Sequence, residues 1–185
     1  MIREYFLPFV LLLFMAVTRY HHFGSALHLP DASWAIFFAA GFYLSRLRWL
    51  AVFLAGAGLI DYLAITQGGS NGYCISAAYP FLIPAYGSLW LGGRWLQRYQ
   101  GFAPATLMYL AMSALVAVTL CFVISNGAFY LFSGRFGELS FAEYGVRFFK
   151  YYPMFLKTTL GYLAIFALLH VLAHKMKGSP RMVKS

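Results

Sequence analysis

The stretch that decides the fold is APATLMYLAMSALVAVTLCFVI, Ala103 to Ile124, which contains no charged side chain. A helix needs roughly 20 mainly apolar residues to cross a bilayer, and this stretch is long enough on its own. The rest of the chain agrees, because 62% of the 185 residues are hydrophobic and only 10% are charged. Soluble domains carry about 25% charged residues. The sequence therefore predicts an integral membrane protein.

Five further apolar segments flank this stretch. Their approximate ranges are 5–20, 32–45, 49–66, 75–95 and 152–174, and with 103–124 they make six predicted spans. None of them shows the alternating pattern of a membrane strand. Because backbone groups inside a bilayer must be satisfied internally, helices are the remaining choice. We expect an all-α integral membrane protein, with residues 1–185 forming a single domain that is one bundle of six transmembrane helices.

The basic residues lie in short clusters between the apolar segments. With six spans, nine of the 14 Lys and Arg residues fall on the side that carries both termini. Loops rich in Lys and Arg stay in the cytoplasm, so we expect a multi-pass protein of the bacterial cytoplasmic (inner) membrane with both termini inside. The net charge of +9 is then explained by basic residues that orient the helices in the lipid bilayer, and we expect no nucleic-acid partner.

Three connections face outward in this topology. They are RYHHFGSALHLPD (19–31), QGGSNGYC (67–74) and SNGAFYLFSGRFGELSFAEYGVRFFKYY (125–152). Unstructured connections longer than about 12 residues are usually functional or disordered, and the high aromatic content argues against disorder. We expect these connections to cover a ligand on the outer face.

Cys74 lies at the end of the second outer connection, just before the fourth span. A thiolate is a soft metal ligand and a strong nucleophile. Two other interpretations stand beside this one: a small apolar filler, or a disulfide with Cys121, expected near the outer end of the fifth span. The residues alone leave all three open.

Other polar groups are candidates for the same outer site. Asp61 lies inside the third span, where it either pairs with Arg19 or hydrogen-bonds a ligand. The histidines at 21, 22 and 28 form interfacial hydrogen bonds or ligate a metal. Several tyrosines in the outer segments suit both an interfacial belt and the lining of a pocket for a broad ligand. They include Tyr73, Tyr79, Tyr86, Tyr130 and Tyr144.

Missing motifs restrict the function further. There is no G-x-x-x-x-G-K-[ST] phosphate loop, so we expect no ATP site in this chain. No G-x-S-x-G or H-E-x-x-H pattern points to a hydrolase. A transporter with this sequence would draw its energy from a partner.

Two stretches carry a resemblance to a known family. VTRYHHFGSALHLPDASWAIFFAAGFYL (17–44) and GYCISAAYPFLIPAYGSLWLGG (72–93) resemble the BtuM family, the small cobalamin-specific S-components of energy-coupling factor (ECF) transporters. The resemblance implies binding of cobalamin (vitamin B12) or other corrinoids from the periplasm, with a cysteine that coordinates the cobalt. The matching residue is Cys74. It also implies loss of cyanide from cyanocobalamin, so Cys74 is the candidate catalytic, metal-binding and ligand-binding residue.

The resemblance also implies a partner, the ECF energising module of a membrane T subunit and two ATPase subunits. Many S-components carry an A-x-x-x-A docking pattern on the first helix, whereas this chain has only Ala16 there. The pattern occurs instead at 35 and 39 and at 51 and 55. From the placement of the residues we expect the corrinoid site to include Tyr73, Tyr79, Tyr86, His28, Asp61, Tyr130 and Tyr144. The alternative function is a membrane thiol-redox or haem- or quinone-binding enzyme that uses Cys74 and Cys121.

Overall fold

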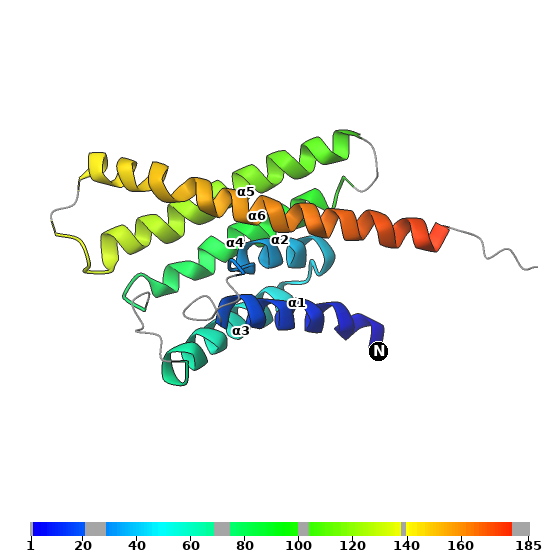
Figure 1. Ribbon diagram of the computed structural model, residues 1–185, viewed down its shortest axis with the longest axis horizontal. Coiled ribbons are helices and arrows are strands. Elements are labelled where there is room, and N and C mark those ends of the chain that lie inside the picture. The colour runs from blue at the N-terminus through cyan, green and yellow to red at the C-terminus, as the bar shows by residue number, and fades with distance from the viewer. Residues whose placement is uncertain (1, 21–28, 69–74, 100–103, 138–139, 179–185) are drawn as a thin grey trace, which may run out of the picture.

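The computed structural model describes residues 2–20, 29–68, 75–99, 104–137 and 140–178. Within these ranges the chain forms helices and no strand, which confirms the all-α class (Figure 1). The elements are α1 (Ile2–Tyr20), α2 (Ser33–Tyr43), α3 (Leu47–Thr66), the 3-10 helix η2 (Tyr79–Phe81), α4 (Leu82–Leu96), α5 (Pro104–Phe132) and α6 (Phe141–Gly178).

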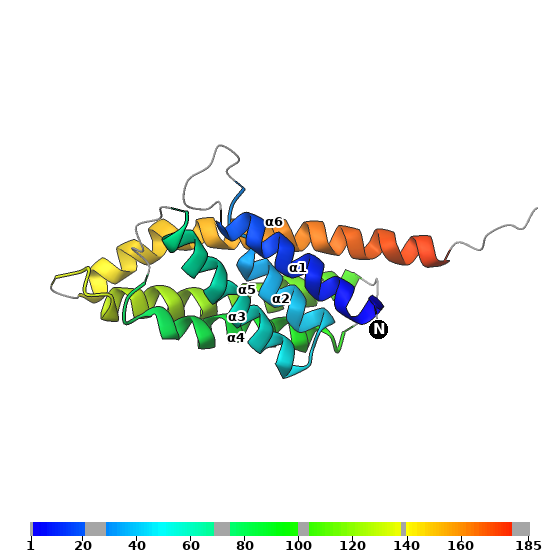
Figure 2. The ribbon, with the colours of Figure 1, turned by 90° about the horizontal axis from the view of Figure 1, so that it is seen from below.

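Consecutive α-helices alternate in direction between the two ends of the molecule, and α3 is steeply inclined to α5 and α6 (Figures 1 and 2). The start of α1 and the end of α6 therefore lie at the same end of the bundle, which we call the terminal end. The opposite end, where α1, α3 and α5 finish, is called the Arg19 end. The α5–α6 pair extends beyond the other helices at the Arg19 end (Figures 1 and 2).

Three of the described helices are long and apolar enough to cross a membrane. These segments are Leu47–Thr66, Ala105–Phe132 and Phe141–Met176. Two shorter apolar helices, Tyr5–Tyr20 and Ser33–Tyr43, accompany them. The structure thus fits a multi-pass membrane protein.

The short helix α2 occupies the centre of the bundle. Its first nine residues, Ser33 to Gly41, are all buried. A helix that is apolar on every side is stable only where other elements surround it. The neighbouring helices α1, α3, α4 and α6 all contact α2, and α4 makes the most extensive contact.

Two glycines allow α2 and α4 to touch backbone to backbone. A Cβ atom at Gly41 would overlap the carbonyl of Trp90, and one at Gly93 would overlap the carbonyl of Phe38. The next pair, α4 and α5, is joined by polar contacts: the Ser113 hydroxyl donates to the Gly92 carbonyl at 2.8 Å. Small residues and such hydrogen bonds are how helices associate inside a membrane.

The predicted boundaries are wrong for the last two spans. The helix predicted at 103–124 continues to Phe132, and the one predicted at 152–174 begins at Phe141. Most of the expected outer connection 125–152 is therefore helical. Pro153 lies inside α6 without ending it, which membrane helices tolerate because neighbouring groups satisfy the freed backbone.

Side-chain packing between α5 and α6 explains this extension. The ring of Phe122 lies 5.2 Å from that of Phe148 and 5.4 Å from that of Tyr152. The hydroxyls of Thr119 and Tyr152 share a hydrogen bond of 2.7 Å. Tertiary packing of this kind outweighs local helix-ending signals, so both helices continue past the residues where the sequence predicts a loop.

The fourth span starts later than its predicted range of 75–95. Pro80 lies in η2, and α4 begins only at Leu82. Proline has no backbone N–H to donate and fits the first turn of a helix. The sequence predicts that Pro80 and Pro84 kink or delay this span. The delay is confirmed at Pro80, whereas Pro84 lies inside the first turn of α4.

Candidate functional site

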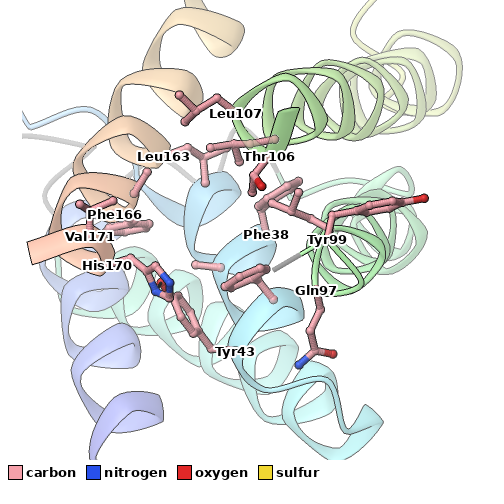
Figure 3. Close-up of a pocket in the computed structure, with 15 residues that line it drawn as sticks. Phe38, Tyr43, Gln97, Tyr99, Thr106, Leu107, Leu163, Phe166, His170 and Val171 are labelled. Atoms are coloured by element: carbon pink, nitrogen blue, oxygen red, sulfur yellow. Dashed lines mark hydrogen bonds between the residues drawn. The ribbon is translucent and has the colours of Figure 1, made fainter. Parts of the chain in front are cut away.

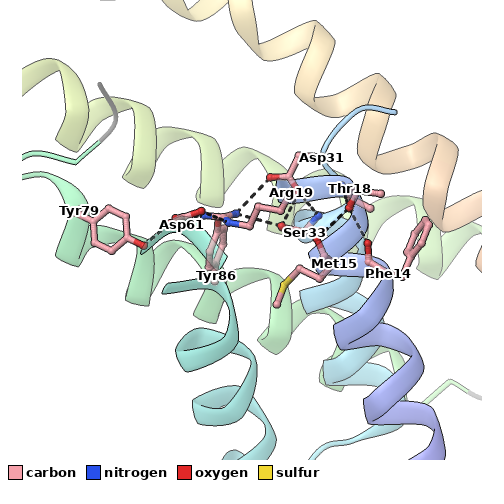
Figure 4. Close-up of polar contacts among 10 residues, drawn as sticks. Phe14, Met15, Thr18, Arg19, Asp31, Ser33, Asp61, Tyr79 and Tyr86 are labelled. Atoms are coloured by element: carbon pink, nitrogen blue, oxygen red, sulfur yellow. Dashed lines mark hydrogen bonds and ion pairs between the residues drawn. The ribbon is translucent and has the colours of Figure 1, made fainter. Parts of the chain in front are cut away.

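A buried arginine organises the Arg19 end. Arg19 lies in the last turn of α1 and is only 8% exposed. Its Nε and Nη2 atoms donate to the two carboxylate oxygens of Asp61 on α3, each at 2.6 Å (Figure 4). This paired geometry is the strong form of a charge-assisted hydrogen bond. It is the ion pair that the sequence predicts between these residues.

The third guanidinium nitrogen reaches two other helices. Nη1 of Arg19 donates to the Tyr86 hydroxyl of α4 at 2.8 Å and to the Ser33 hydroxyl of α2 at 3.1 Å. It also lies 3.3 Å from the Asp31 carboxylate. One side chain therefore connects α1, α2, α3 and α4 (Figure 4).

Asp31 also satisfies the start of α2. Its Oδ1 atom accepts hydrogen bonds from the Ser33 backbone N–H at 2.9 Å and from the Ser33 hydroxyl at 2.6 Å. The sequence predicts Asp31 as the N-cap, whereas the N-cap position is occupied by Ala32. The predicted position is wrong by one residue, although the Asp31 carboxylate does receive a first-turn N–H group.

Tyr79 connects η2 to the same cluster. Its hydroxyl donates to Oδ2 of Asp61 at 2.8 Å. A carboxylate offers about four acceptor sites, and three of those on Asp61 are taken by Arg19 and Tyr79. Asp61 is thus engaged with protein groups, and its main role within the described residues is to hold Arg19 and Tyr79 in place. We call Arg19, Asp31, Ser33, Asp61, Tyr79 and Tyr86 the Arg19 cluster.

A cavity of ≈ 490 Å³ lies between the extended ends of α5 and α6. Tyr130 and Tyr144 line it together with Phe81 of η2. The Phe81 ring stacks on Phe132 of α5 at 5.1 Å. The segment that follows Cys74 therefore reaches this cavity, which we call the tip cavity.

Three buried polar atoms near the tip cavity have no hydrogen-bond partner among the described residues. They are the Tyr144 hydroxyl, Oδ1 of Asn126 and Nε of Arg147. The Tyr144 hydroxyl lies against α5, since a Cβ atom at Gly127 would lie 3.4 Å from it. Buried polar groups are rarely left unsatisfied, so this region has free capacity to bind a polar ligand.

The predicted site residues fall into three groups. Asp61, Tyr79 and Tyr86 meet in the Arg19 cluster, and Tyr130 and Tyr144 meet at the tip cavity, with ring centroids 5.5 Å apart. His28, Tyr73 and Cys74, as well as the histidines at 21 and 22, lie outside the described residues.

Sequence reasoning missed Ser33 in the cluster and Asn126 and Arg147 near the tip cavity. Ser33 had a usable signal, because Asp31 and a serine two residues later open an apolar run. Asn126 and Arg147 stand in a segment interpreted as a loop, so neither the α5 position of Asn126 nor the helical spacing of Arg147 from Tyr144 on α6 could be recognised.

Cys121 does not lie where the sequence predicts it. It precedes the end of α5 by 11 residues, or ~16 Å along the helix axis, rather than lying near that end. The thiol is free and its exposed fraction is 0%. This burial is typical of a cysteine that fills space in a core. Within the described ranges, no three His, Cys, Asp or Glu side chains gather as a metal site.

A scan against protein-family models finds no match, and a search of curated proteins finds no significant relative. The resemblance to the cobalamin S-components therefore stays a prediction from the sequence.

Proposed function

We propose that this protein is a membrane-embedded corrinoid-binding and uptake protein that captures cobalamin at the Arg19 end. In this proposal the six α-helices form one bundle in the bacterial cytoplasmic membrane, which α3, α5 and α6 cross in full while the shorter helices pack among them. The terminal end faces the cytoplasm and the Arg19 end faces the periplasm. The observation that carries the proposal is the Arg19 cluster, because it fixes the elements on either side of both connections that hold the histidines and Cys74.

The anchoring of Tyr79 supports the role proposed for Cys74. Tyr79 is anchored to Asp61 and follows Cys74 by five residues. A chain of that length spans at most ~18 Å, and we accordingly propose that Cys74 acts at the Arg19 end. In this proposal the thiolate meets a ligand that enters at that end of the bundle.

The tip cavity supplies a second contact for such a ligand. Its volume of ≈ 490 Å³ is within the range of small-molecule sites. A corrinoid is larger than a drug-sized molecule, so the cavity would take one edge of it. Corrin rings carry amide side chains, and the Tyr144 hydroxyl and Arg147 Nε could donate to their carbonyls, while Asn126 Oδ1 could accept from their N–H groups.

The proposed chemistry at Cys74 is ligand exchange at cobalt. The thiolate would donate an electron pair to cobalt on one face of the corrin and displace the ligand bound on that face, which leaves with its own electron pair. Cyanide on the opposite face is then held more weakly and leaves as CN⁻ with the electron pair of its bond. The oxidation state of cobalt does not change, so the step needs no added reductant. Capture and removal of cyanide would follow from the same bond.

Release to the cytoplasm needs an energy source, for which we propose an ECF module. Ala35 and Ala39 are buried inside the bundle and are not available for docking. Ala51 and Ala55 lie on the exposed face of α3. Small residues at this spacing allow a partner helix to approach closely, so we propose this face for the T subunit.

The absorbance spectrum of the purified protein after exposure to cobalamin tests the proposal. The wild type is expected to be coloured, with a corrin spectrum shifted from that of free cobalamin, because thiolate ligation changes the cobalt. In Cys74→Ala the shift is expected to disappear. Cys121→Ala is the matched control and should behave as the wild type, since its thiol is buried in the core.

A colourless wild type at saturating cobalamin would overturn the proposal. A loss of the shift that is equal in Cys121→Ala and Cys74→Ala would instead favour the thiol-redox alternative. That alternative needs an accessible thiol at Cys121, and the burial of Cys121 does not favour it.

A further inference from the structure

A second cavity, of ≈ 520 Å³, lies toward the terminal end of the bundle, enclosed by residues of α2, α4, α5 and α6 (Figure 3). It is separate from the Arg19 cluster and the tip cavity, and nothing in the proposed function uses it. Its deep part is apolar: Phe38 of α2 faces Leu163 and Phe166 of α6 across it (Figure 3).

One hydrogen bond closes the cavity between α2 and α6. The Tyr43 hydroxyl lies 2.9 Å from Nδ1 of His170, and the two rings are 5.7 Å apart. The same cavity has an exposed apolar margin on α5, where Leu107 is 65% exposed. Because α5 and α6 are long apolar helices of the kind that cross membranes, this margin would face lipid.

All four helices become more polar in the same direction along the cavity. On α2 the lining changes from Phe38 to Tyr43, and on α5 it changes from Leu110 to Thr106. At the end of α4 it changes from Leu96 to Gln97 and Tyr99, which follow the helix, and on α6 from Leu163 to His170. The lining therefore suits an amphiphile whose tail lies deep in the bundle and whose head lies toward the terminal end.

Basic side chains surround the polar end of the cavity. Arg98 lies between two lining residues, and Lys175 follows the lining residue Val171 by four positions, on the same face of α6. Both side chains are exposed, and the structure shows neither of them paired with an acid among the described residues.

Acidic side chains are concentrated at the other end. Asp31 and Asp61 belong to the Arg19 cluster, and Glu143 lies in the first turn of α6. Among the described residues this leaves Glu4, in α1, as the one acid toward the terminal end. The head of a bound amphiphile would thus meet a positive field.

We propose that this cavity binds an acyl chain of an anionic phospholipid, with the lipid phosphate held near Arg98 and Lys175. A volume of ≈ 520 Å³ is within the range of small-molecule sites, and the apolar lining matches a hydrocarbon chain. The charge of the surrounding residues selects an anionic head over a zwitterionic one. Such a lipid would fill the space between α2, α5 and α6 and support their packing.

Native mass spectrometry of the full-length protein tests the proposal. The protein is reconstituted in vesicles of equal parts phosphatidylglycerol and phosphatidylcholine, extracted in a mild detergent, and analysed for bound lipid. The wild type is expected to retain phosphatidylglycerol in preference to phosphatidylcholine. Ala167→Phe places a ring in the cavity, so it should lose the retained lipid. The control Ala164→Phe makes the same change on the exposed face of α6 and should retain it.

A second variant tests the charge argument without filling the cavity. Arg98→Gln combined with Lys175→Gln should reduce the preference for phosphatidylglycerol by ~30-fold, the effect expected of two basic contacts near a lipid head. Equal retention of both lipids by the wild type would overturn the proposal. Unchanged lipid retention in a folded Ala167→Phe variant would also overturn it. If Ala167→Phe fails to fold, an unchanged preference for phosphatidylglycerol in the double variant overturns it instead.

Discussion

Replacing Asp61 by asparagine is expected to lower the free energy of unfolding by about 3–5 kcal/mol, because it leaves a buried guanidinium without its counter-charge. Both carboxylate oxygens of Asp61 are bonded to Arg19, which is 8% exposed. Asparagine has nearly the same shape but no charge, and its amide nitrogen cannot accept a hydrogen bond from Arg19. The measurement is an unfolding titration in detergent, with size exclusion to show that the starting material is folded.

A matched control for this change is Glu143→Gln. Its carboxylate is exposed and accepts a hydrogen bond of 3.2 Å from Tyr130, so the expected loss is only about 0.5–1.5 kcal/mol. Arg19→Lys should also be damaging, because one ammonium cannot replace a fork that reaches Asp61, Ser33 and Tyr86 together. If Asp61→Asn proves as stable as Glu143→Gln, the Arg19 cluster does not hold the helices together.

The second large effect is expected at Gly93. Gly93→Ala should lower the free energy of unfolding by about 1–3 kcal/mol, the range found for overpacked cores. A Cβ atom there would overlap the backbone carbonyl of Phe38, and a backbone carbonyl cannot swing away as a side chain can. To accept the methyl group, α2 and α4 must move apart. The same unfolding titration measures the loss.

The control for this prediction lies in the same helix. A Cβ atom at Gly87 would have nothing within 4 Å, so Gly87→Ala should be neutral or should stabilise the protein by roughly 0.5–1 kcal/mol through better helix propensity. Equal effects at the two positions would show that α2 and α4 do not approach as closely as described.

The sequence predicts the class of fold well, because apolar composition and segment length have few solutions in a bilayer. The all-α class and the Arg19–Asp61 pair follow from such reasoning and are confirmed. The ends of α5 and α6 could not be predicted in this way. They depend on contacts between Phe122 and Phe148 that appear only once both helices exist.

The candidate site is only partly predictable for the same reason. Tyr79 and Tyr86 stand out in the sequence as outer tyrosines. Their hydrogen bonds, of Tyr86 with Arg19 and of Tyr79 with Asp61, arise only from helix packing. Gly127 and Tyr144 lie in a segment that is predicted as a loop, and their contact appears only because the segment forms the ends of α5 and α6. Cys121 is deeper than predicted because α5 is longer than predicted.

The most direct test of the proposed function is X-ray absorption at the cobalt edge of protein loaded with cobalamin. We expect a sulfur atom in the coordination shell of cobalt in the wild type and in Cys121→Ala. The same sulfur should be absent in Cys74→Ala. A cobalt shell with only carbon, nitrogen and oxygen ligands in the wild type would contradict the role proposed for Cys74.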